Sequence, residues 1–212
     1  MGEFPYLEKF RAQVEPPEPE PLWEPAFDAL ETLPPPSRQL LEWEQVFEEL
    51  GTALPPDFVA FIQIYGASSF GNDFLGISDP REFIEPTYAQ AMRAQGDRYR
   101  ALRDDYPQFH PLAAWPEPGG FLSWGFDVDG NTFGWLTQGE PSQWPTAVWG
   151  RQMPDGVIDH VPMTQFMYGW LTTPITYPQC FPPLPGLVSE RDLDENRKLK
   201  PHIPRKLTCR RF

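Results

Sequence analysis

The spacing of apolar residues predicts two short helices in the first third of the chain. The first spans residues 37–50, with Ser37 as its N-cap and Gly51 at its end, and its apolar positions are Leu40, Trp43, Phe47 and Leu50. The second spans residues 56–65 and ends at Gly66, and its apolar positions are Phe58, Phe61, Ile62 and Tyr65. A tight connection through Pro55 joins the two helices.

Further along the chain, the pattern predicts a sheet between two more helices. A polar helix is expected from Thr87 to about Arg103, and a closing helix over residues 163–171. Strand-like runs cover residues 69–77, 121–127, 132–137, 146–150 and 157–161. The segment from Asp127 to Asn131 lies between two aromatic runs and has the Asp-Gly-Asn composition of a hairpin turn. This order predicts an α+β fold, with an antiparallel twisted sheet in meander order and about four short helices.

Composition divides the chain into one domain and two flanking segments. Apolar residues make up 40% of the 212 residues, enough for a core, whereas the 28 prolines exclude long helices. Residues 1–36 contain nine prolines and eight acidic residues, which favours an extended arm. We therefore expect an arm over residues 1–36, a folded domain over 37–185 and a basic tail over 186–212.

The charge distribution favours a basic partner. The net charge is −13, and residues 190–212 hold eight Lys or Arg against four Asp or Glu, which leaves residues 1–189 at −17. Such a body repels a phosphate backbone and attracts a basic protein, so we expect a protein partner and no nucleic-acid partner. The basic tail leaves a nucleic-acid contact open, as an alternative to folding back on the acidic body.

The sequence contains no pattern typical of a catalytic, cofactor or metal site. Its histidines, His110, His160 and His202, stand outside any recognisable motif. The acids from Asp127 to Asn131 lack the glycine and glutamate spacing of a calcium loop, and Cys180 and Cys209 lack zinc spacing and are expected to remain thiols. We expect no catalytic residues, cofactor, metal, small-molecule substrate or membrane contact, and a cytoplasmic location.

Two motifs resemble those of the SUKH superfamily. The stretch Leu54-Pro55-Pro56-Asp57-Phe58, followed by Tyr65-Gly66, is similar to that family's opening helix. The segment Trp124-Gly125-Phe126-Asp127-Val128-Asp129-Gly130 is similar to its Trp-Gly-x-Asp-x-x-Gly hairpin, and the aromatic helix near Phe166 is similar to its last helix. Together these matches cover roughly residues 38–172.

The resemblance implies an α+β fold without catalytic residues, as in bacterial immunity proteins and in cell-wall-assembly regulators of the Smi/Knr type. The leading hypothesis is an immunity protein that occludes a basic toxin domain, for example a nuclease. The predicted contact residues are loop acids and one tryptophan: Asp73, Asp79, Asp127, Asp129 and Trp144. An intracellular regulatory or scaffolding module of the Smi/Knr type and a hydrolase using Asp127, Asp129 and His160 are the alternatives.

Overall fold

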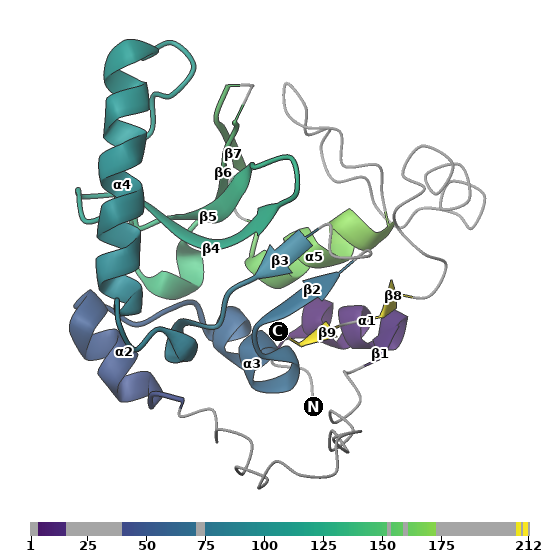
Figure 1. Ribbon diagram of the computed structural model, residues 1–212. Coiled ribbons are helices and arrows are strands. Elements are labelled where there is room, and N and C mark those ends of the chain that lie inside the picture. The colour runs from purple at the N-terminus through teal and green to yellow at the C-terminus, as the bar shows by residue number, and fades with distance from the viewer. Residues whose placement is uncertain are drawn as a thin grey trace, which may run out of the picture.

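A seven-stranded antiparallel sheet forms the centre of the fold (Figure 1). The computed structural model describes residues 4–15, 40–70, 75–151, 154–158, 161–172, 207–208 and 210–211. The strands of this sheet, in spatial order, are β7 (Gly156–Ile158), β6 (Thr146–Trp149), β5 (Thr132–Leu136), β4 (Phe121–Asp127), β3 (Leu75–Ile77), β2 (Ser68–Phe70) and β9 (Arg210–Arg211). Because β2 to β7 follow chain order, the predicted meander is confirmed.

Five α-helices and two short 3₁₀ helices are described around the sheet. They are α1 (Pro5–Gln13), α2 (Trp43–Leu50), α3 (Pro56–Tyr65), η1 (Pro80–Glu82), α4 (Tyr88–Asp105), η2 (Pro141–Gln143) and α5 (Met163–Thr172). In Figure 1, α4 stands along one flank of the sheet, whereas α1, α3 and α5 gather on the other side. The α+β class predicted from the sequence is therefore confirmed.

The alternation of side chains along the strands divides the apolar interior into two clusters. Trp124 and Trp135 face the main core, which also takes in residues of α1, α3 and α5. Phe121 and Trp149 point to the opposite face, where they pack with Tyr99 of α4 in a smaller cluster. The sheet thus lies between two unequal helical layers.

The hairpin between β4 and β5 forms as the sequence predicts. Gly130 has a φ of +86°, which a side chain would strain, and its N–H donates to the carbonyl of Asp127 at 3.0 Å. The Asp127 carboxylate accepts hydrogen bonds from the backbone N–H and the side-chain amide of Asn131, both at 2.9 Å. The acid therefore holds the turn closed.

Some element boundaries differ from the predictions. Helix α2 begins at Trp43 rather than at Ser37, and Glu42 occupies the N-cap, where its backbone N–H donates to Gln45 Oε1 at 3.0 Å. Ser37 lies outside the described residues. The expected strand 69–77 is two antiparallel strands, β2 and β3, in which Phe70 pairs with Leu75.

The expected arm and tail both contribute to the folded body. Within residues 1–36, α1 places Leu7 and Phe10 in the main core, so the prediction of an extended arm is wrong for residues 5–13. Two apolar side chains on one helical face outweigh the local proline and glutamate content once they are buried. Within residues 186–212, β9 pairs with β2, and β8 (Leu207–Thr208) pairs in parallel with β1 (Val14–Glu15).

Candidate functional site

A cavity of about 370 Å³ lies between α4, the β4–β5 hairpin and the end of β6. Its lining residues come from all three elements and from the loop after α4: Gln95, Arg98, Tyr99, Leu102, His110, Gly130, Thr132, Trp149, Gly150 and Arg151. Aromatic and aliphatic side chains accompany a few convergent polar groups, which is the usual composition of a ligand site.

Stacked rings form the floor of this cavity. The Tyr99 and Trp149 rings are nearly parallel, at 10°, with centroids 4.0 Å apart. Phe121 stacks on Trp149 at the same centroid distance, and the His110 ring meets Tyr99 nearly edge-on at 5.8 Å. Because these rings are buried and packed on one another, the floor is preformed.

The buried carboxylate of Asp155 forms hydrogen bonds with several residues in the wall of the cavity. The Asp155 side chain is fully buried, and it accepts hydrogen bonds from the Tyr99 hydroxyl and, at 3.3 Å, from the Gly150 N–H. Burial raises the pKa of Asp155, against the opposing effect of its hydrogen bonds with Tyr99 and His110. Burial is the main reason that the pKa of Tyr99 lies far above that of a free phenol, and the neighbouring Asp155 carboxylate raises this pKa further. The Tyr99 hydroxyl therefore keeps its proton and remains a donor.

The same carboxylate orients His110. Asp155 Oδ1 lies 3.1 Å from His110 Nδ1, and the histidine side chain is 10% exposed. Among the described residues, His110 Nε2 has no hydrogen-bond partner, although the residue lines the cavity. An imidazole held through Nδ1 in this way leaves Nε2 to act on whatever occupies the cavity.

Two arginines lie at the rim. Arg98 and Arg151 are both exposed and line the cavity, and neither forms an ion pair with a described residue. The backbone N–H of Arg151 donates to Asn131 Oδ1 at 3.0 Å, and its side chain lies against Gly130, where an added Cβ would come within 2.6 Å of Arg151 Cδ. The hairpin thus positions one of the two guanidinium groups.

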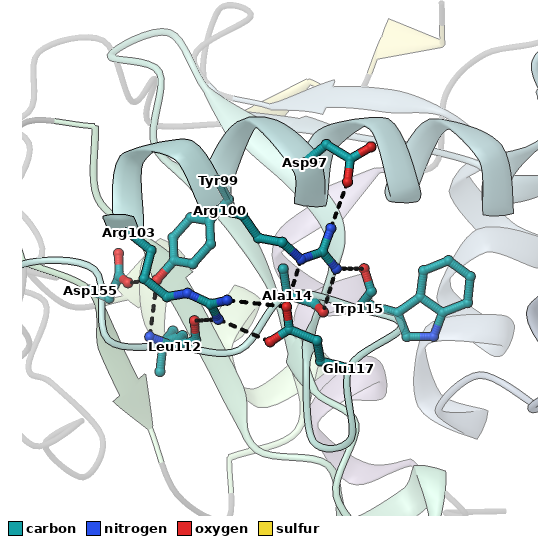
Figure 2. Close-up of polar contacts among 9 residues, drawn as sticks. All are labelled: Asp97, Tyr99, Arg100, Arg103, Leu112, Ala114, Trp115, Glu117 and Asp155. Atoms are coloured by element: carbon teal, nitrogen blue, oxygen red, sulfur yellow. Dashed lines mark hydrogen bonds and ion pairs between the residues drawn. The ribbon is translucent and has the colours of Figure 1, made fainter. Parts of the chain in front are cut away.

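A charged cluster fastens α4 to the loop that precedes β4 (Figure 2). Glu117 Oε1 accepts from Arg100 Nε at 2.6 Å, and Glu117 Oε2 accepts from Arg103 Nη1 at 2.9 Å. The hydrogen bonds from Arg103, and then those from Arg100, lower the pKa of Glu117 to about 2. Arg103 also donates to the carbonyl of Leu112, and the N–H of Leu112 donates to the Tyr99 hydroxyl. The charged cluster is therefore linked through Leu112 to a residue that lines the cavity.

No known protein family, curated protein or solved structure matches this chain. Within the described ranges, no three His, Cys, Asp or Glu side chains converge as metal ligands would. None of the helices in the described part of the chain is long and apolar enough to cross a membrane.

Two of the predicted contact acids are not available at the surface. Asp79 is 1% exposed and binds the backbone N–H and the guanidinium of Arg81, with the nearest carboxylate–guanidinium contact at 2.8 Å. Asp127 is 3% exposed and holds Asn131 in the hairpin turn. The expectation that both are exposed loop acids is therefore wrong, because local hydrogen bonds draw them inward.

The three remaining predicted contact residues differ in where the structure places them. Trp144 is 5% exposed, packs near Trp135 and donates from Nε1 to the Gly139 carbonyl at 3.1 Å, so it is a core residue rather than an exposed anchor. Asp129 is exposed on the hairpin as expected. Asp73 lies outside the described residues.

The structure describes the proposed hydrolase residues only in part. Asp127 is engaged by Asn131, and His160 lies outside the described residues. Within the described part of the chain, His110 lines the cavity, although no sequence motif indicates it. Its partner Asp155 is 45 positions away, and no local spacing links the two.

Proposed function

We propose that this protein is a non-catalytic, cytoplasmic binding protein of the SUKH type, an immunity protein that neutralises a basic toxin domain by covering its surface. The observation that carries the proposal is the imbalance of exposed charge. The exposed acids of the described residues are Glu8, Glu42, Glu44, Glu48, Glu49, Glu85, Asp97, Asp104, Asp105, Asp129 and Glu140, and the exposed bases are Lys9, Arg11, Arg93, Arg98 and Arg151.

Helix α2 contributes most to this imbalance. Glu44, Glu48 and Glu49 are all exposed on its eight residues, and none of them has an ion-pair partner in the described part of the chain. Like charges four residues apart, such as Glu44 and Glu48, destabilise a helix slightly. A basic partner would relieve this repulsion and would be steered to the surface during approach.

The residues that carry the SUKH resemblance build the scaffold. Trp124 is fully buried, and a Cβ on Gly125 would come within 2.7 Å of the Gly76 carbonyl oxygen. Asp127 and Gly130 form the hairpin turn. Because these positions stabilise the fold, we assign partner binding to the exposed acids. A protein that binds through its surface in this way can occlude its partner.

The test uses the product of the adjacent reading frame. Its C-terminal domain is expressed in cells with and without the full-length protein, and co-expression is expected to restore growth. Continued killing in cells that contain the folded protein would refute the proposal. Recovery of housekeeping proteins alone in a pull-down would favour the regulatory or scaffolding alternative.

Charge-reversal variants then test the surface. Glu44→Lys/Glu48→Lys is expected to slow association with the toxin domain by about tenfold at low salt, and the difference should shrink as salt is added. Glu8→Lys/Glu140→Lys makes the same change in net charge on other elements and is the matched control. Equal slowing in both variants would show that only total charge matters.

A further inference from the structure

We propose that the cavity between α4, the β4–β5 hairpin and β6 binds a small organic anion. Its apolar body would lie against Tyr99, Trp149 and Leu102, and its carboxylate or phosphate group would be held by Arg98 and Arg151. This inference is independent of the proposed immunity function.

The charge at this cavity has the opposite sign to that of the whole protein. Although the net charge is −13, none of the cavity's described lining residues is an Asp or Glu, and two are arginines. Two guanidinium groups beside one hollow repel each other unless an anion lies between them. Local charge therefore selects an anionic occupant.

The other exposed bases of the described residues have partners. Lys9 lies over the rings of Tyr6 and Tyr168, at 5.0 and 5.8 Å. Arg11 pairs with Glu8 at 3.6 Å, and Arg93 lies 5.0 Å over Trp115. Arg98 and Arg151 are the exposed bases left without a described carboxylate or aromatic partner, and both line this cavity.

The floor offers apolar surface that a small ion would leave uncovered. A free phosphate or acetate would satisfy the guanidinium groups and leave the apolar surface of Tyr99, Trp149 and Leu102 uncovered. A volume of about 370 Å³ suits a small organic molecule. Leu102 is 47% exposed, so a ligand that covers it adds hydrophobic stabilisation to the ionic contact.

The wall is held in place before any ligand arrives. Asp155 holds Tyr99 and His110 through hydrogen bonds, and its own fully buried side chain is not among the residues that line the cavity. His110 Nε2 is one of the polar atoms of the wall, and in the imidazolium form it donates to an anion. Because the wall is already ordered, ligand binding does not include the entropic cost of ordering these side chains.

Nuclear magnetic resonance titration of the ¹⁵N-labelled full chain tests the proposal. The probes are phenylacetate and phenyl phosphate, with phenylacetamide as the uncharged analogue and acetate as the anion without an apolar body. At least one anionic aromatic probe is expected to bind with a Kd below about 1 mM, at least about tenfold tighter than either control. Its shifts should centre on the Trp149 indole and the amides of Gly150 and Arg151. The stronger of the two anions identifies carboxylate or phosphate as the preferred group.

Matched variants separate the cavity from general electrostatics. Arg98→Gln/Arg151→Gln is expected to weaken binding at least about tenfold, whereas Lys9→Gln/Arg93→Gln, with the same change in charge, should leave it unaltered. Equal binding of phenylacetamide, shifts centred elsewhere, or no probe binding below about 1 mM would each overturn the proposal. Toxin neutralisation by Arg98→Gln/Arg151→Gln is expected to be intact, so failure of one proposal is distinguishable from failure of the other.

Discussion

Asp57 joins two helices that are far apart in the chain. The sequence places it in the first turn of the helix that begins at Pro56, where an acid is favourable. In the structure, Asp57 Oδ2 also accepts hydrogen bonds from the backbone N–H and the hydroxyl of Thr164, at 3.0 and 2.9 Å. It therefore satisfies a donor in the first turn of α5.

Removal of this carboxylate should destabilise the fold. Asp57→Ala is expected to lower the free energy of unfolding by about 1–3 kcal/mol, because two buried donors of Thr164 lose their acceptor. Urea denaturation measures the effect, and the exposed acid Glu44→Ala is the control, with a change within about 0.5 kcal/mol. Equal effects would mean that the Asp57–Thr164 contact contributes nothing.

Glu117 gives the protein a stabilising contact that depends on pH. Its carboxylate has a pKa of about 2 in the folded protein against 4.5 ordinarily, so pairing with Arg100 and Arg103 stabilises the fold only while Glu117 is ionised. Since 31% of this side chain is exposed, solvent screening limits the effect to about 1 kcal/mol.

Glu117→Gln should therefore be less stable than the wild type at pH 7 by about that amount. The difference is expected to shrink as the pH falls below 4.5 and to vanish below about 2. Denaturation series across this range measure it, with Glu140→Gln as the exposed control. A gap that is constant with pH would show that the contact acts through packing.

At the scale of elements, local patterns predicted best where a helix or strand carries its own signals. Helix α3 has the predicted bounds because a proline begins it, a glycine ends it and its apolar positions repeat at helical spacing. Strand β4 and its hairpin turn are likewise local. Helix α1 was missed because nearby proline and glutamate residues dominate the composition, and its burial depends on distant contacts.

Phe10 tests whether α1 belongs to the body. It is fully buried and meets Phe61, Tyr65 and Phe70 edge-on, with centroids 5.4–5.6 Å away. Phe10→Ala is expected to cost about 3–5 kcal/mol of unfolding free energy, whereas the exposed Gln13→Ala should be nearly neutral. An unchanged melting temperature in Phe10→Ala would restore the arm interpretation.

At the scale of the molecule, the net charge predicts the acidic surface but does not predict the cavity. The net charge correctly indicated an excess of exposed acids, but a sum over the chain cannot show that Arg98 and Arg151 meet at one cavity. Nor can spacing show that His110, Tyr99 and Asp155 converge, because three separate segments supply them. Such sites arise from packing and leave no local pattern.

Strand β9 covers the edge of β2, which would otherwise present unpaired backbone groups. Ser68 and Ser69 pair with Arg211 and Arg210. A chain ending at Thr208 keeps β8 and lacks β9, and it is therefore expected to self-associate through the uncovered edge of β2. Full-length Arg210→Gln/Arg211→Gln should stay monodisperse at the same concentration. Sedimentation velocity measures this, and identical behaviour of the two proteins would show that β9 does not protect the edge.

Because the interior is divided into two clusters, two parts of the molecule can open to solvent at different free energies. Tyr99 and Trp149 belong to the small cluster under α4, whereas Trp124 and Trp135 belong to the large one. The C-terminal part of α4, from Tyr99 onward, can lift away by breaking only the small cluster and its polar links, whereas Tyr88 and Ala89 hold the first turn in the large cluster. The amide protons of this C-terminal part therefore become accessible to deuterium before those of β4. Movement of that helix would open one wall of the cavity while the rest of the sheet stays closed to solvent.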